Sequence, residues 1–254
     1  MINLAIKAAL AAGAIHLKYF NKDIKINTKS SHHDRVTIAD LESEKKIVNI
    51  IKEKYPDHNF LAEENIYEKT GSEYTWIIDP LDGTNNFSKN MPIFCVSIAL
   101  AKKEEIILGV IYNPINKELF TAKKGKGAYL NKKRIHVTSS KDLKDSLMIT
   151  GFYYDRGEPM LKTLVNIKKF LLKKILGIRR LGSAALDLAN IACGRADGFW
   201  EWYLSPWDFA AGILLVEEAG GKVTTKAGEK IKIKPSYVVA SNGLIHKKML
   251  EVLN

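Results

Sequence analysis

The chain has 254 residues, 46% of them hydrophobic and 26% charged, so it can bury a sizeable core as one large domain or as two closely packed halves. Its 39 Lys and Arg residues exceed its 28 Asp and Glu residues, and the net charge of +11 favours anionic partners, from phosphorylated metabolites to nucleic acid. Its 2 cysteines exclude a disulfide framework, and no apolar stretch reaches the ~20 residues of a membrane-spanning helix, so we expect a cytoplasmic protein with no membrane partner.

Helical and strand patterns alternate in the first half of the chain. Apolar residues at helical spacing predict helices over residues 2–20 and 40–55. A short buried strand is predicted over residues 76–79, and we expect it to stop at Pro80. Three further strands are predicted, separated by turn-forming Gly and Asn-Pro pairs, over residues 94–102, 106–112 and 118–122.

The pattern changes near residue 150. Helices are predicted over residues 160–176, 184–193 and 208–219, with a short strand over residues 199–202 before the last helix. We therefore expect a layered α/β or α+β protein, with halves 1–150 and 151–254 that form one compact unit.

The helix predicted over residues 160–176 is amphipathic and basic. Its apolar stripe consists of Leu161, Leu164, Val165, Ile167, Phe170 and Leu171, with lysines opposite. We expect the stripe to pack on the core and the lysines to face water; a nucleic-acid or membrane face is the alternative.

Two carboxylates follow the strand predicted over residues 76–79. Asp79 and Asp82 stand three residues apart with Pro80 between them, on a stiff turn at a strand end. Carboxylates held this close repel each other unless a proton or a cation lies between them, and ligands that are all oxygen suit magnesium. Gly83 and Thr84 then begin a turn or helix whose backbone N–H groups can bind phosphate. Taken alone, the Asp82-Gly83 pair is more typical of an ordinary surface turn.

Two further acidic segments fit the same chemistry. Glu63-Glu64 follows an apolar pair, and Asp208 stands at the start of the last predicted helix. Each has a simpler interpretation, as a solvated face or as a helix cap, and spacing alone cannot show that they converge. The pair His32-His33 has no metal-ligand spacing, and we interpret it as solvated.

Five segments together resemble the inositol monophosphatase family. Residues 76–87, with the sequence WIIDPLDGTNNF, resemble its first signature, and WDFAAG (207–212) with VEEAGG (216–221) resembles its second. LAEE (61–64), KSSHHDRVTIAD (29–40) and IRRLGSAA (178–185) are similar to three further family elements. The segments come in family order across nearly the whole chain. Ala62 and Asn85 depart from the family pattern, at positions whose side chains are not ligands.

The resemblance implies a fold and a metal site. The fold would be the sugar-phosphatase sandwich of alternating helix and sheet layers. Glu63, Asp79 and the Leu81 carbonyl would bind one Mg²⁺; Asp79, Asp82 and Asp208 would bind a second, with a weaker third ion near Glu63. Thr84, hydrogen-bonded to Asp40, would orient and help to deprotonate the attacking water, without a covalent phosphoenzyme.

The resemblance also implies a substrate class, a small phosphate monoester such as myo-inositol 1-phosphate. The residues expected on the substrate side are Asp82, Gly83, Thr84, Arg179, Gly182, Ser183, Ala184 and Glu201. A homodimer and lithium sensitivity are further expectations. Fructose-1,6-bisphosphate, histidinol phosphate and nucleotide 3′-phosphates remain alternative substrates, and an RNA- or transcription-associated accessory role is the alternative from another class.

Overall fold

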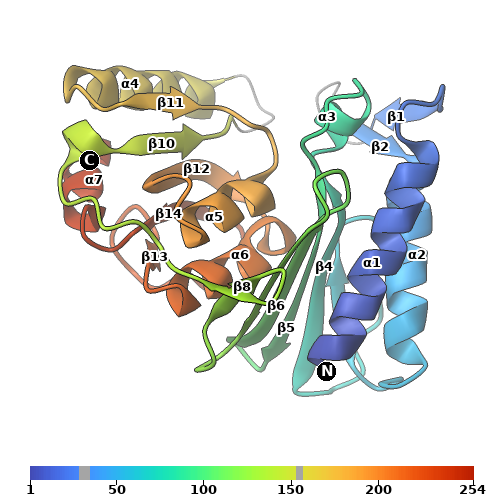
Figure 1. Ribbon diagram of the computed structural model, residues 1–254. Coiled ribbons are helices and arrows are strands. Elements are labelled where there is room, and N and C mark those ends of the chain that lie inside the picture. Colours follow the sequence, from blue (N-terminus) through green and yellow to red (C-terminus); the bar gives the residue numbers. More distant parts are fainter. Residues whose placement is uncertain (29–34, 153–156) are drawn as a thin grey trace.

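Helix layers and sheet layers alternate through the molecule (Figure 1). The computed structural model describes residues 1–28, 35–152 and 157–254. Helices α1 (Ile2–Tyr19) and α2 (Ile38–Lys52) cover the outer face of a seven-stranded sheet. Helices α5 (Ala184–Ala192) and α6 (Pro206–Glu218) lie between this sheet and a five-stranded sheet. The layered sandwich expected from the sequence is confirmed.

The seven-stranded sheet carries the acidic turn. Its strands follow chain order: β3 (Asn59–Ala62), β4 (Tyr74–Asp82), β5 (Cys95–Lys102), β6 (Glu105–Asn113), β7 (Glu118–Lys123), β8 (Ala128–Leu130) and β9 (Lys133–Ile135). The expectation that the strand beginning at residue 76 stops at Pro80 is wrong. This strand is β4, which continues to Asp82 with a register shift between Asp79 and Asp82. Pro80 lies inside this irregularity, where its missing N–H breaks no regular ladder pair.

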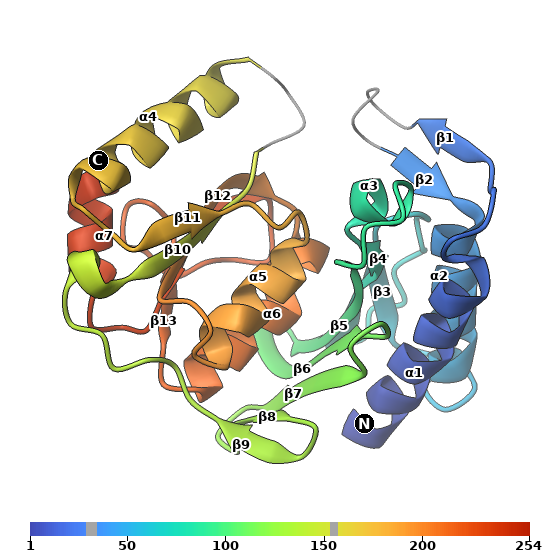
Figure 2. The ribbon, with the colours of Figure 1, turned by 45° about the horizontal axis from the view of Figure 1, so that its top comes forward.

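The five-stranded sheet and the remaining elements complete the second half. Its order is β11 (Gly177–Arg179), β10 (Leu147–Thr150), β12 (Gly198–Leu204), β14 (Ser236–Ser241) and β13 (Lys222–Thr224). Helices α4 (Glu158–Leu172) and α7 (His246–Leu253) contact its strands β12 and β14 on the side away from α5 and α6 (Figure 2). Four short elements remain among the described residues: the β1–β2 pair (Ile26–Thr28 and Arg35–Thr37), the one-turn helix α3 (Thr84–Phe87) and the 3-10 helix η1 (Leu143–Asp145). No helix among the described residues is long and apolar enough to span a bilayer.

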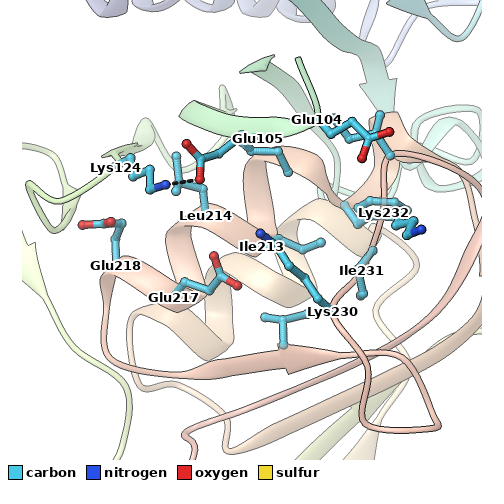
Figure 3. Close-up of a pocket in the computed structure, with 14 residues that line it drawn as sticks. Glu104, Glu105, Lys124, Ile213, Leu214, Glu217, Glu218, Lys230, Ile231 and Lys232 are labelled. Carbon is cyan, nitrogen blue, oxygen red and sulfur yellow. Dashed lines mark hydrogen bonds and ion pairs between the residues drawn. The ribbon is translucent and has the colours of Figure 1, made fainter. Parts of the chain in front are cut away.

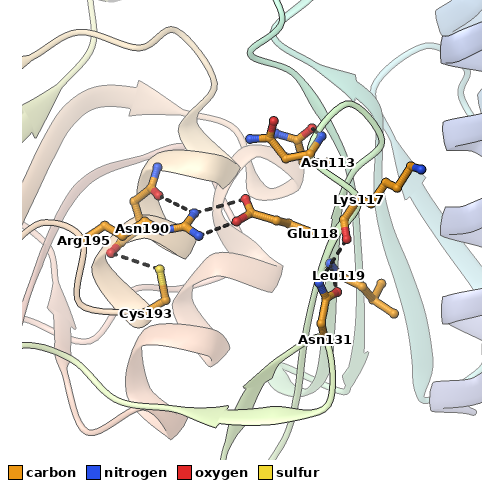
Figure 4. A network of polar contacts seen from close by, with 9 residues as sticks. Asn113, Lys117, Glu118, Leu119, Asn131, Asn190, Cys193 and Arg195 are labelled. Carbon is orange, nitrogen blue, oxygen red and sulfur yellow. Dashed lines mark hydrogen bonds and ion pairs between the residues drawn. The ribbon is translucent and has the colours of Figure 1, made fainter.

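The two sheets share one hydrophobic core. A single buried cluster includes Ile77 and Phe120 of the first sheet together with Leu188, Phe209 and Leu215 of the middle helices. A polar link lies beside it: Arg195, just after α5, donates to the Glu118 carboxylate of β7 and to Asn190 Oδ1 at 3.4 Å (Figure 4). The middle helices are thereby fixed against the strand layer that carries the acidic turn.

The expected packing of the basic helix is wrong in part. In α4 the buried residues are Thr163, Asn166 and Phe170, whereas the apolar side chains at 161, 164, 165 and 171 are about half exposed. Thr163, Asn166 and Phe170 recur at i, i+3 and i+7, so a mixed polar and apolar face meets the rest of the protein. The predicted stripe is therefore divided: Ile167 and Phe170 pack on the core, whereas the remaining four residues, Leu161, Leu164, Val165 and Leu171, lie outside it.

Candidate active site

The Asp79–Asp82 turn is buried and held from two sides. The Leu81 N–H donates to Asp79 Oδ1 at 2.9 Å, which closes the turn on itself. From α1, the buried His16 donates from Nε2 to the Pro80 carbonyl at 2.8 Å. Burial lowers the pKa of His16 to about 4, so the ring is neutral at physiological pH and its single proton lies on Nε2. Nothing in the sequence pattern pointed to His16.

The predicted hydrogen bond between Thr84 and Asp40 is present. Thr84 Oγ1 lies 2.9 Å from Asp40 Oδ1 and 2.9 Å from the Leu81 carbonyl. Asp40 is fixed at the start of α2 because its Oδ2 accepts from the Thr37 N–H at 2.8 Å and from the Thr37 hydroxyl at 2.6 Å. Burial raises the pKa of Asp40 to about 6, and the hydrogen bonds from Thr37 oppose this shift. Thr84 follows Gly83, whose φ of 98° lies in the left-handed region and favours glycine.

Four carboxylates from three segments repel one another at this end of the sheet. Burial raises the pKa of Asp79 well above its usual value, and the charges of Glu63, Asp82 and Asp208 raise it further. Burial is also the main cause that raises the pKa of Asp208, and the charges of Glu63 and Asp82 raise it further. The pKa of Asp82 is raised to about 6 by burial. Spacing in the sequence could not show whether these four acidic residues converge. The structure brings them together.

The chemistry of this donor set fits a hard divalent cation. All four side chains supply oxygen, and their mutual repulsion is relieved by a positive charge. As the side chains stand, no three His, Cys, Asp or Glu residues of the described part surround a common point for a metal ion. Each carboxylate is held partly by the protein instead, so binding requires the side chains to turn toward one another.

Asp82 is held by the start of α5. Its Oδ2 accepts from the Ser183 hydroxyl at 2.6 Å and from the Ala185 N–H at 2.7 Å. A carboxylate at the N-terminus of a helix is favoured by the helix dipole. Ser183 and the start of α5, which the resemblance places on the substrate side, thus also position a predicted metal ligand. Gly182 has a φ of 87°, a conformation that favours glycine.

Asp208 and Glu63 are oriented by their own segments. The Ser205 N–H donates to Asp208 Oδ2 at 2.7 Å, so the carboxylate caps α6 while it faces the cluster. Glu63 follows β3, and its neighbour Glu64 donates from its N–H to Glu44 Oε2 at 2.8 Å. The buried Glu44 also accepts from Tyr67 at 2.9 Å, which fixes the segment after β3. The sequence analysis missed Glu44, which looks like any acid on a helix.

Glu201 lies in a second acidic group beside the first. Burial raises its pKa to about 8; the charge of Arg180 lowers it and the charge of Asp82 raises it. Asp187 of α5 is buried, and burial is the main cause that raises its pKa. The charges of Glu201 and Asp82 raise it further. Arg179, which the resemblance suggested as a contact, is exposed and donates to the adjacent Ile178 carbonyl at 3.3 Å. The arginine whose charge acts on Glu201 is therefore Arg180, one residue further along.

Two surface pockets lie elsewhere. One, of about 180 Å³, is lined by residues of the β5–β6 turn, α6 and the segment 230–233, with Glu104, Glu217 and Lys230 around it (Figure 3). The other, of about 540 Å³, lies between α4 and α7 and includes Lys169 and Lys248. Neither is lined by a residue of the carboxylate cluster, so neither bears on its chemistry.

Comparison with known proteins agrees with this geometry. The model of the inositol monophosphatase family matches residues 1–254. The chain belongs to the inositol monophosphatase family. It is 42% identical to an inositol-1-monophosphatase of Synechocystis sp. over 99% of this chain and 88% of that protein. It is also 42% identical to the Nus factor SuhB of Escherichia coli K12 over 98% and 94% of the two chains.

A solved structure of this family has the same fold. The extragenic suppressor protein suhB of Bartonella henselae superposes with a TM-score of 0.94 at 40% identity, covering 99% of this chain and 97% of that one. Family membership accounts for the five matching segments. The segment 29–34 of one of them, including His32 and His33, lies outside the described residues.

The repulsion within the cluster yields a prediction on stability. Asp79→Asn should raise the free energy of unfolding of the metal-free protein at pH 8 by about 1–3 kcal/mol, because it removes one buried charge and keeps the oxygen that accepts from Leu81. The folded-state pKa of Asp79 is raised, so its destabilising effect is absent at low pH and grows as the pH rises through that pKa. The two proteins should therefore converge near about pH 4.

Urea unfolding in EDTA from pH 4 to 8 measures this difference. The exposed Asp23→Asn serves as the control and should show little change at any pH. A wild type more stable than Asp79→Asn at pH 8 without metal would contradict the repulsion.

Proposed function

We propose that this protein is a magnesium-dependent phosphatase that hydrolyses myo-inositol 1-phosphate or a similar polyol monophosphate. The observation that carries the proposal is the buried carboxylate cluster next to the Thr84–Asp40 hydrogen bond, in a member of the inositol monophosphatase family. The relative named inositol-1-monophosphatase supports the choice of substrate. Lithium sensitivity and a homodimeric state remain predictions from the family.

Glu63, Asp79, Asp82, Asp208 and the Leu81 carbonyl would hold two to three Mg²⁺ ions. When bound, magnesium supplies the positive charge that lowers the pKa of water and stabilises the leaving oxygen. Ser183 and Ser205 donate to one oxygen of Asp82 and one of Asp208, respectively, so the second oxygen of each carboxylate would be the one offered to a metal ion. Gly83 and Thr84 would offer backbone N–H groups to the phosphate.

Thr84 and Asp40 would position and activate the attacking water. Thr84 donates its proton to Asp40 Oδ1 at 2.9 Å, so its lone pairs are free to accept from water. With a pKa raised to about 6, Asp40 can receive a proton near neutral pH. Water then attacks phosphorus directly while the bond from phosphorus to the alcohol oxygen breaks. The proton of the water passes through the Thr84 hydroxyl to Asp40, and the released alkoxide takes a proton from solvent.

Glu201 would recognise the alcohol that departs. Its carboxylate is close enough to Asp82 for the two charges to interact, and it lies on β12, a few residues before Asp208. An ionised carboxylate accepts hydrogen bonds from vicinal hydroxyls and repels a second phosphate. The Gly182–Ser183–Ala184 segment would lie beside it, and Arg180 rather than Arg179 would be its basic partner, because the charge of Arg180 lowers the pKa of Glu201.

The metal requirement is tested by removal and by substitution. EDTA should abolish turnover of inositol 1-phosphate and excess Mg²⁺ should restore it, because the cluster cannot neutralise phosphate without a cation. Asp208→Asn keeps the Ser205 hydrogen bond through its amide oxygen but loses a charge, so kcat/KM should fall by on the order of 10²–10³-fold. Asp23→Asn is the control. Near-normal turnover of folded Asp208→Asn at ordinary Mg²⁺ would remove Asp208 from the site.

Substrate preference is tested at Glu201. Above about pH 8, where Glu201 is ionised, the wild type should cleave inositol 1-phosphate with a kcat/KM roughly ten- to hundredfold above that for fructose 1,6-bisphosphate, because two charges at ~4–6 Å repel by a few kcal/mol at an effective dielectric near 20. The preference should increase with pH as Glu201 ionises, and Glu201→Gln should reduce it and make it independent of pH. A wild type that prefers the bisphosphate outright would contradict this assignment.

The accessory role is the second candidate, favoured by relatives named Nus factor SuhB and by the net charge of +11. If the basic surface only solubilises the protein, RNA binding should be weak and should fall steeply with salt, because it rests on counterion release. Filter binding of an RNA panel between 50 and 200 mM salt measures this. Selective binding that resists salt would favour the accessory role.

A further inference from the structure

Glycine at position 151 is not required by its backbone. Gly151 follows β10 directly and is buried, and it is absent from the glycines that have a positive φ. An alanine can adopt its conformation, so the reason for glycine must lie in the space beside its Cα.

That space is occupied by the Glu201 carboxylate. A Cβ built on Gly151 would lie 2.0 Å from both Oε1 and Oε2 of Glu201 and 2.1 Å from its Cδ. The contact follows from the sheet register, in which β10 and β12 run parallel and Thr150 is the partner of Trp200. Gly151 and Glu201 are the next residues along the two strands.

Other groups surround the same carboxylate. Glu201 interacts electrostatically with Arg180 and Asp82, and its charge also acts on the buried Asp187. One Asp187 carboxylate oxygen is buried without a hydrogen-bond partner among the described residues. The carboxylate of Glu201 therefore has acidic neighbours on the side of α5 and of the predicted metal ligands. At the end of β10 it lies instead against the backbone of a residue that has no side chain.

We infer that Gly151 is a specificity-determining position, because its missing side chain provides the space in which Glu201 faces the leaving alcohol. The inference rests on the proposed function. The three atoms nearest to an alanine Cβ at 151 all belong to the far end of a flexible side chain, so the protein should still fold while the carboxylate moves by roughly an ångström. A shift of this size is enough to impair the positioning of a substrate.

A double-mutant cycle in unfolding tests the geometry without any assay of activity. Gly151→Ala should lower the urea midpoint when Glu201 is present. It should have no effect, or raise the midpoint, in the Glu201→Ala background, where the colliding atoms are absent. Equal effects in both backgrounds would overturn the inference, whether or not the protein is a phosphatase.

The same double-mutant cycle, measured by enzyme kinetics, tests the proposed role of Gly151 in substrate specificity. Gly151→Ala should lower kcat/KM for inositol 1-phosphate by on the order of ten- to hundredfold, mainly through KM, and less for 4-nitrophenyl phosphate, whose alcohol lacks vicinal hydroxyls. Added to Glu201→Ala, it should cause no further loss. Additive losses, or equal losses on both substrates, would overturn the role.

Gly13→Ala is the matched control. Gly13 is a buried glycine of α1, and a Cβ on it would collide with the Tyr112 ring rather than with an acidic residue. It should lower stability by a similar mechanism without changing the ratio of kcat/KM between the two substrates, and its effect should add to that of Glu201→Ala. A wild type without turnover on either substrate would refute the proposed function but would leave the unfolding cycle intact as a test of the Gly151–Glu201 contact.

Discussion

Electrostatic repulsion among buried carboxylates is the constraint on which the functional end of this molecule depends. Glu63, Asp79, Asp82 and Asp208 are brought together although burial and the charges of their neighbours disfavour the ionised forms of Asp79 and Asp208. Such an arrangement costs folding free energy, and the core shared by the two sheets must supply it. A positive charge among these carboxylates would relieve the repulsion, which is the physical reason for proposing a divalent cation there.

The fold limits the repulsion by giving each carboxylate its own hydrogen-bond donors. Asp79 accepts from the backbone of its own turn, Asp82 from the start of α5, and Asp208 from the backbone before α6. These donors belong to elements that pack for other reasons, so the acidic residues are fixed before any ligand arrives. The backbone positions of these residues are thus set, whereas their side chains must still turn toward one another to share a cation.

The sequence predicted the layered fold and the longer elements because their apolar periodicity is strong, and the family resemblance identified the acidic residues. Prediction from the sequence failed where contacts between distant segments determine the local structure. β4 continues past Pro80 because the strand shifts register there, and α4 buries Thr163 and Asn166 because α7 and β12 meet that face. His16, Glu44 and Asp187 carry no local signal, since their importance arises only from what the fold places beside them. Arg180 differs from Arg179 only in the direction of its side chain.

The residues proposed to activate water and those proposed to recognise the alcohol lie in different layers of the sandwich. The groups proposed to activate water, Thr84 and Asp40, belong to the first sheet and its outer helices, whereas Glu201 and Gly151 belong to the second sheet. The cluster itself joins them, because Asp79 and Asp82 come from β4 and Asp208 from α6. A change in the second sheet can therefore alter which alcohol is accepted while the first sheet keeps the geometry of attack. Under the proposed function, this separation would let substitutions at the ends of β10 and β12 change the accepted alcohol without moving Thr84 or Asp40.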